Sequence, residues 1–160
     1  MEAPPGGLAL QGELWEACDA GWGGVHTSPG DLARFGQAIL EGGTLDGVRI
    51  LAETTVRSMC TDQIPGVPAR FGPDRDIRVA SWGYGFAVIN EQRWPYFGGC
   101  LVPPGSVSHP GAGGIDFWID FDHGLVGVFF EVITEMSPDL EPVSGIGNRF
   151  QDVITAAVIR

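Results

Sequence analysis

The 160-residue chain contains no lysine, because all nine of its basic side chains are arginines. A Schiff-base enzyme, a P-loop nucleotide site and a Ser-Lys nucleophile pair each need a lysine, so none of them can be completed within this chain. Twenty acidic residues bring the net charge to −11, which leaves no basic face to displace counterions from phosphates. The composition therefore argues against a nucleic-acid partner.

Long apolar runs and paired cysteines are also absent. No apolar run approaches the roughly 20 residues that cross a bilayer, and residues 1–5 lack the basic and apolar regions of a secretory signal. Cys18, Cys60 and Cys100 form no CxxC or Cys/His cluster, which favours free thiols. We therefore expect no membrane span and no cofactor. The protein is expected to be cytoplasmic if the reading frame is complete, and export stays open otherwise.

The first half of the chain carries helix signals. Ser28-Pro29-Gly30-Asp31 combines a serine N-cap, a proline at the first helical position and an acid three residues after the cap. Apolar side chains at helical spacing follow until Gly42-Gly43, which ends the helix. A second short helix is predicted at about 53–61, and the proline-rich residues 62–81 are predicted to form a long surface loop.

From residue 82 onward the pattern changes to that of strands. Short β-branched and aromatic runs, separated by Gly, Pro, Asn and Asp, are predicted to be strands; they are 82–90, 106–109, 114–120 and 125–132. Residues 148–159 carry apolar side chains at helical spacing. We expect an α+β fold, in which this C-terminal helix packs on an antiparallel sheet of three to four strands, with short N-terminal helices.

The most distinctive segment is Ser106–Gly114, in which His109 and Pro110 precede four small residues. Small residues let backbone amides approach a ligand closely. An ordinary glycine-rich turn between strands is the alternative interpretation. Ser108 is a poor nucleophile candidate, because neighbours on a strand point to opposite faces and Ser108 cannot easily bond to His109.

Other chemistry-bearing residues have plainer interpretations. Asp120, Asp122 and His123 fit the spacing of no common metal site and are interpreted as a solvated hairpin tip. Trp82, Trp94 and Trp118 are interpreted as core or pocket-wall residues, not as platforms for a cofactor.

Five segments of the chain stand in an order that resembles a known family. They are Gly23–Gly36, Leu45–Leu51, Trp82–Phe86, His109–Gly114 and Gly124–Val128. Together they resemble the C-terminal part of the serine β-lactamase-like family, which includes class C β-lactamases, D-Ala-D-Ala carboxypeptidases and related esterases. The resemblance extends across nearly the whole chain from residue 21 onward.

The family has three motifs, of which this chain matches one. Ser-x-x-Lys supplies the nucleophile and its base, Tyr-x-Asn assists proton transfer, and a Lys or His followed by a small residue and Gly lies beside the pocket. His109-Pro110-Gly111 matches the third. The resemblance implies that His109 lines the pocket, where it either steadies the tyrosine of the second motif or binds the substrate. It also implies that Gly111 contacts the substrate and that the amide of Ala112 donates to the oxyanion. Pro110 replaces the usual Thr, Ser or Gly, which argues against recognition of a β-lactam carboxylate.

The two missing motifs would lie upstream of Met1 in the family order. The resemblance thus implies a partial β-lactamase-like, penicillin-binding protein-like fold, with residues 1–160 as one C-terminal segment. This segment comprises an irregular lead-in (1–24), helices and a loop (25–81), and the sheet with the last helix (82–160).

By the same resemblance, the full-length protein would hydrolyse a small-molecule ester or amide through an acyl-enzyme, and the chain alone would be inactive. The alternatives are a non-catalytic binding module derived from the fold, or one half of a two-chain hydrolase. A chain that lacks the upstream half is expected to associate through an exposed sheet face or edge.

Overall fold

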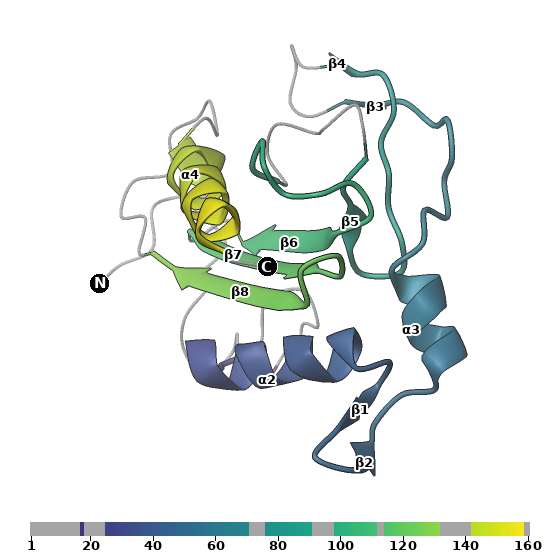
Figure 1. Cartoon of the computed structure of the whole chain (residues 1–160). Coiled ribbons are helices and arrows are strands. Elements are labelled where there is room, and N and C mark those ends of the chain that lie inside the picture. Colours follow the sequence, from purple (N-terminus) through teal and green to yellow (C-terminus); the bar gives the residue numbers. More distant parts are fainter. Residues whose placement is uncertain are drawn as a thin grey trace.

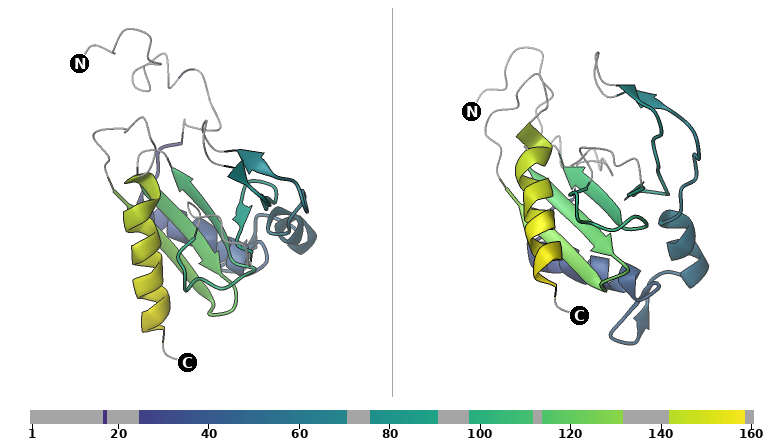
Figure 2. Two further views of the ribbon diagram at one scale, coloured as in Figure 1. Left: turned by 90° about the horizontal axis from the view of Figure 1, so that it is seen from above. Right: turned by 45° about the horizontal axis from the view of Figure 1, so that its top comes forward.

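The computed structural model describes residue 17 and residues 25–70, 76–90, 98–111, 114–131 and 142–158. Its centre is an antiparallel four-stranded sheet with strand order β5-β6-β7-β8 (Figure 1). These strands are β5 (Ala87–Val88), β6 (Val107–Gly111), β7 (Ile115–Asp120) and β8 (Leu125–Phe130). Helix α2 (Pro29–Leu40) covers one face and helix α4 (Pro142–Ala157) covers the other, as Figure 2 also shows. The predicted α+β fold is confirmed.

Helix α2 begins and ends where its local signals predict. Ser28 Oγ accepts a hydrogen bond from Asp31 N at 3.1 Å, which satisfies one of the free amides of the first turn. Beyond the helix, Gly42 and Gly43 adopt φ values of 72° and 94°, which glycine reaches without strain. A Cβ at Gly36 would overlap the side chains of Val126 and Phe117, so glycine lets α2 lie close against the sheet.

Two apolar clusters hold the layers together, one on each face of the sheet. On the α2 face, Ile39 of α2 packs with buried residues that include Phe117 of β7. On the α4 face, the fully buried Trp118 packs with Phe150 and Ile154 of α4. Successive residues of β7 thus point to opposite faces, as the period of a strand requires. We refer to these as the α2 face and the α4 face.

Short elements extend the fold beyond the main sheet. A hairpin joins β1 (Thr44–Leu45) to β2 (Val48–Arg49), and a second one joins β3 (Ala69–Arg70) to β4 (Asp76–Ile77). In the first turn, Asp46 and Gly47 have φ values of 50° and 78°, the conformation of tight hairpin turns. Helix α3 (Glu53–Met59) follows the first hairpin.

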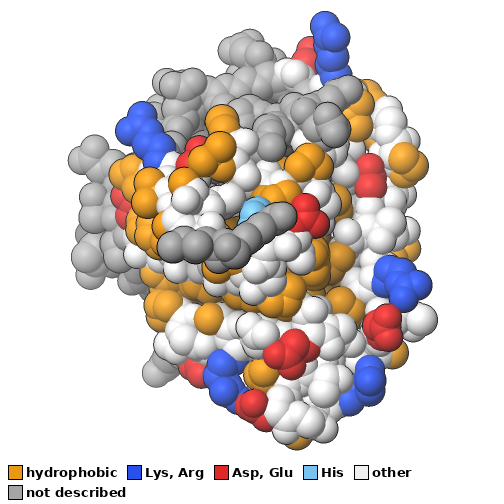
Figure 3. Space-filling view, viewed as in Figure 1, with side chains coloured by type: hydrophobic (Ala, Val, Ile, Leu, Met, Phe, Trp, Pro, Cys, Tyr) orange, Lys and Arg blue, Asp and Glu red, His pale blue; other side chains and the backbone are white. Residues whose placement is uncertain are grey.

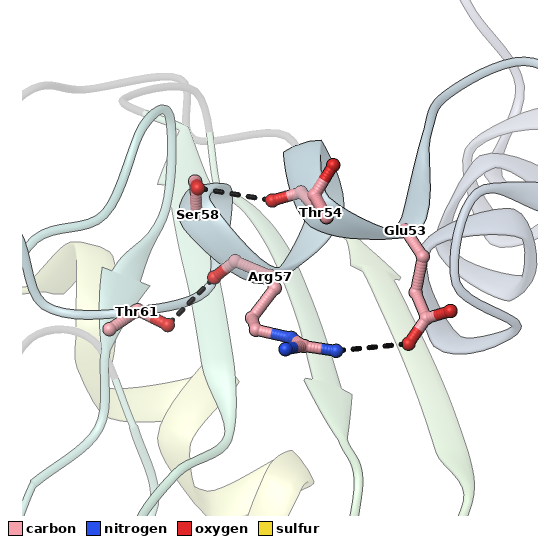
Figure 4. A network of polar contacts seen from close by, with 5 residues as sticks. All are labelled: Glu53, Thr54, Arg57, Ser58 and Thr61. Carbon is pink, nitrogen blue, oxygen red and sulfur yellow. Dashed lines mark hydrogen bonds and ion pairs between the residues drawn. The ribbon is translucent and has the colours of Figure 1, made fainter.

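The end of α3 is closed by polar contacts with its own backbone. Figure 4 shows Ser58 Oγ donating to Thr54 O and Thr61 Oγ1 donating to Arg57 O, at 3.0 and 2.7 Å. Gln63 Nε2 donates to Ser58 O at 3.1 Å. The bonds to Arg57 O and Ser58 O satisfy carbonyl groups that the helix end leaves free, and they hold the segment after α3 in place.

Several predicted boundaries are wrong; β6, for example, was predicted to end at His109 and runs to Gly111. Only Ala87–Val88 of the predicted strand 82–90 is a strand, because the chain turns back on itself where Gly83 N donates to Phe86 O at 2.8 Å. The predicted loop 62–81 contains β3 and β4, joined by the ion pair of Arg70 with Asp76. The last helix begins at Pro142 instead of Asn148. Within the described residues, no helix is long and apolar enough to span a bilayer.

Candidate functional site

The strand that carries the predicted site residues, β6, is open along part of one edge. On one side, β7 pairs with the whole of β6 from Val107 to Gly111. On the other side, β5 pairs only with Val107 and Ser108. No described residue pairs with His109–Gly111 on that side, so within the described part of the chain this stretch of β6 is an unpaired edge. We call this stretch the open edge of β6.

Pro110 suits the open edge because of the direction in which its backbone points. Ser106 O accepts from Ile89 N at 2.8 Å, so the backbone of Ser106 faces the β5 side. Backbone groups along a strand alternate in direction with a period of two residues, so Pro110 faces the same side. A proline lacks the N–H that a ladder partner would need, and sheets accept it where that position faces an edge. The strand therefore continues past His109 to Gly111.

His109 lies at the surface of the α2 face, beside Trp82. Its cross-strand partner is Phe117, whose side chain belongs to the cluster on that face. The imidazole is exposed, and it meets the half-buried indole of Trp82 edge-on, with ring centroids 5.9 Å apart and the planes 73° apart. Figure 3 shows that hydrophobic side chains make up much of the surface in this view. His109 is therefore accessible to a ligand.

Gly111 lies two residues further along β6, with its backbone at the end of the β6–β7 ladder. It pairs with Ile115, and its carbonyl oxygen accepts from Gly114 N at 3.0 Å. A Cβ at this position would lie 3.2 Å from Ile115 Cβ, so glycine keeps the strand end uncrowded. The structure thus places His109 and Gly111 on one strand, while Ala112 lies outside the described residues.

Ser108 lies on the other side of the sheet from His109. Its cross-strand partner is Trp118, on the α4 face, and its side chain is 1% exposed. The expectation that Ser108 and His109 point to opposite faces is confirmed. A serine buried beneath α4 is out of reach of a ligand at the open edge.

The interpretation of Asp120 as part of a solvated hairpin tip is wrong. Its side chain is fully buried, and it accepts from His123 N at 3.0 Å. The other carboxylate oxygen lies 2.6 Å from His123 Nδ1. Asp120 therefore closes the turn between β7 and β8 by binding its backbone, whereas Asp122 is exposed.

A buried carboxylate lies behind the open edge, and sequence reasoning missed it. Asp116 faces Pro110 across the ladder and is 3% exposed. Burial, and after it the negative charge of Glu131, raise the pKa of Asp116 from 3.8 to about 6. A Cβ at Gly147 of α4 would overlap Asp116 Oδ2, so the carboxylate lies directly against that helix. The two-residue period shared with Trp118 was the signal that places Asp116 on a buried face.

In the part of the chain that the structure describes, the side chains do not favour metal binding or thiol chemistry. Within it, no three His, Cys, Asp or Glu side chains gather as a metal site requires. Cys60 and Cys100 are free thiols, as expected, and burial raises the pKa of Cys60 from 9.0 to about 11. A thiol with so high a pKa is a poor nucleophile at neutral pH. Cys18 lies outside the described residues.

Comparison with known proteins identifies the fold and the family of the chain. A crystal structure of a beta-lactamase from Mycobacterium bovis matches with a TM-score of 0.60 and 22% sequence identity, over 79% of this chain and 43% of that one. This likeness shows the fold, and the chain spans less than half the length of that structure. No curated protein matches the chain significantly. The Beta-lactamase family model matches residues 2–139, which is most of the chain. The chain therefore belongs to the β-lactamase family.

Proposed function

We propose that residues 1–160 are the C-terminal portion of a serine hydrolase of the β-lactamase family and form one wall of its acyl-transfer site. The observation that carries this proposal is the exposed His109 at the open edge of β6, followed by Gly111 on the same strand. In the family that the chain resembles, the third motif lies on a strand beside the pocket. An open strand edge with an accessible imidazole suits that role.

In the proposed reaction, a serine supplied from outside this chain attacks the carbonyl carbon of an ester or amide. The carbonyl oxygen takes up negative charge, and the amide of Ala112 would be one of its two donors. His109 would contact the substrate or the tyrosine of the second motif. Gly111 has no side chain, so it would leave room for the substrate to approach the backbone of β6. The ester C–O or amide C–N bond then breaks, and the alcohol or amine leaves with a proton that balances the one lost by the serine hydroxyl. Water next attacks the acyl-serine, which releases the carboxylic acid and restores the serine hydroxyl.

The chain by itself is expected to be inactive, because it has no lysine to activate a serine. Five serines whose side chains the structure describes are also badly placed. Ser28 and Ser58 bond with helical segments, and Ser81, Ser106 and Ser108 are buried. Each of these five side chains is either buried or held in a hydrogen bond at a helix.

A fluorophosphonate probe tests this proposal directly, because it labels activated serines. We expect the isolated chain to remain unlabelled, with an intact serine hydrolase as the positive control. Stoichiometric labelling of one serine in the isolated chain would refute the proposal. Co-expression with a polypeptide carrying Ser-x-x-Lys and Tyr-x-Asn tests the two-chain alternative, in which ester hydrolysis should appear and should fall in His109→Ala.

A non-catalytic binding module is the second candidate, and the two apolar clusters favour it. Both faces of the sheet are covered by helices, with side chains such as Ile39 and Trp118 fully buried. A module should therefore be a monomer with one cooperative melting transition. A chain that needs an upstream half should instead associate through a sheet face or edge, bind a hydrophobic dye and elute early from a size-exclusion column.

A further inference from the structure

The contact between Trp82 and His109 joins two parts of the chain that are distant in sequence. Trp82 is half-buried and His109 is exposed, so the contact joins a partly enclosed ring to one at the surface. The rings meet edge-to-face at 5.9 Å between centroids, a geometry that aromatic pairs prefer. A ring held in this way loses part of its rotational freedom.

The backbone of Trp82 is fixed from both sides. Its carbonyl oxygen accepts from Gln63 N at 2.7 Å, and the residue forms a β-bridge with Ala87. The next residue, Gly83, lies so close to the carbonyl oxygen of Met59 at the end of α3 that a Cβ would overlap it. The backbone that carries the indole is thus held against the end of α3 and the start of β5.

The backbone of His109 is constrained independently of its side chain. Its β6 position pairs with Phe117, and a residue that precedes proline is restricted to extended conformations. The side chain, by contrast, borders the open edge of β6, where no described strand confines it. The edge-to-face contact with the Trp82 ring limits the rotation of the imidazole.

We propose that Trp82 is a positioning residue that holds the imidazole of His109 at the open edge of β6. Because the backbone next to Trp82 lies against the end of α3, the end of α3 sets the orientation of the His109 imidazole through this contact. The proposed function places this imidazole in the wall of the pocket. The catalytic meaning of the inference rests on the proposed function. The contact itself can be tested in the isolated chain.

The chain has three histidines, which makes the test selective. In Trp82→Ala, the ¹H–¹³C NMR signals of the His109 ring should lose their ring-current shift, and reaction of His109 with diethyl pyrocarbonate should become several-fold faster. Trp82→Phe should restore most of the slow reaction, because phenylalanine keeps an aromatic ring at this position. Tyr84→Ala is the matched control, since Tyr84 is on the same loop but is 62% exposed.

His123 reports whether a variant is still folded, because its ring lies against the buried Asp120. If His123 stays protected in Trp82→Ala while the His109 signals and reactivity remain as in the wild type, the inference is overturned. If Trp82→Ala exposes His123 as well, that variant is no longer folded, and the Trp82→Phe variant tests the inference instead. In a folded Trp82→Phe protein, the inference requires a smaller ring-current shift at His109 than in the wild type. Labelling by the fluorophosphonate probe would refute the proposed function and leave these NMR results unaffected.

Discussion

Replacing Asp116 with asparagine should stabilise the protein at neutral pH. The carboxyl group is 3% exposed, and its pKa is raised from 3.8 to about 6 by burial and by Glu131. A rise of this size corresponds to about 3 kcal/mol of unfavourable free energy for the ionised group in the folded state. Asparagine has nearly the same shape and no charge, so it keeps the packing against Gly147 while removing this cost.

The sign of the pH dependence follows from the direction of the pKa change. The folded protein holds the Asp116 proton more tightly than the unfolded chain, so the cost is fully present above a pH of about 6. It is relieved as the pH falls from about 6 toward 3.8. The wild type should therefore gain stability between pH 7 and about pH 5, and Asp116→Asn should lack this gain.

Urea denaturation followed by tryptophan fluorescence at these two pH values measures the effect. Glu131→Gln is the control, and it should give a smaller stabilisation because Glu131 is the second cause of the raised pKa. The reasoning is refuted if Asp116→Asn unfolds at a lower urea concentration than the wild type at pH 7 and shows the same change between the two pH values.

Two further changes test the packing of α2. Ser28→Ala should lower the free energy of unfolding by about 1 kcal/mol, because Asp31 N loses its side-chain acceptor; Thr27→Ala, whose hydroxyl makes one long bond of 3.4 Å, should have a smaller effect in the same urea titration. Gly36→Ala should lower it by about 1–3 kcal/mol through overlap with the sheet, whereas Gly30→Ala, with only Ser28 Oγ at 3.8 Å, should be tolerated; equal melting temperatures for the two glycine variants would contradict the close packing of α2.

The two long helices differ in how well their limits could be predicted. Helix α2 is set by neighbouring residues, since Ser28 caps its start and Gly42 follows its end. Helix α4 begins earlier than its apolar stripe, and its first turns include Gly145 and Gly147, which favour helix weakly. Gly147 lies against Asp116 of β7. This contact between distant segments cannot be obtained from the periodicity of the helix.

The candidate site could be predicted only in part, again because some of its contacts join segments that are distant in sequence. The motif at His109 is local, and its position on a strand could be inferred from the residues around it. That the strand continues through Pro110 depends on which edge the proline faces, and this is known only once β6 is paired with β5 and β7. The contact of His109 with Trp82 likewise joins two segments that only the folded sheet brings together.

Pro110 also bears on how copies of this chain meet in a concentrated solution. Two molecules that joined their β6 strands to make one continuous sheet would each present a carbonyl oxygen and no amide at the proline. Intermolecular ladders therefore meet an interruption at this point, which discourages fibre growth along this side. A small molecule with a single N–H or O–H group meets no such obstacle.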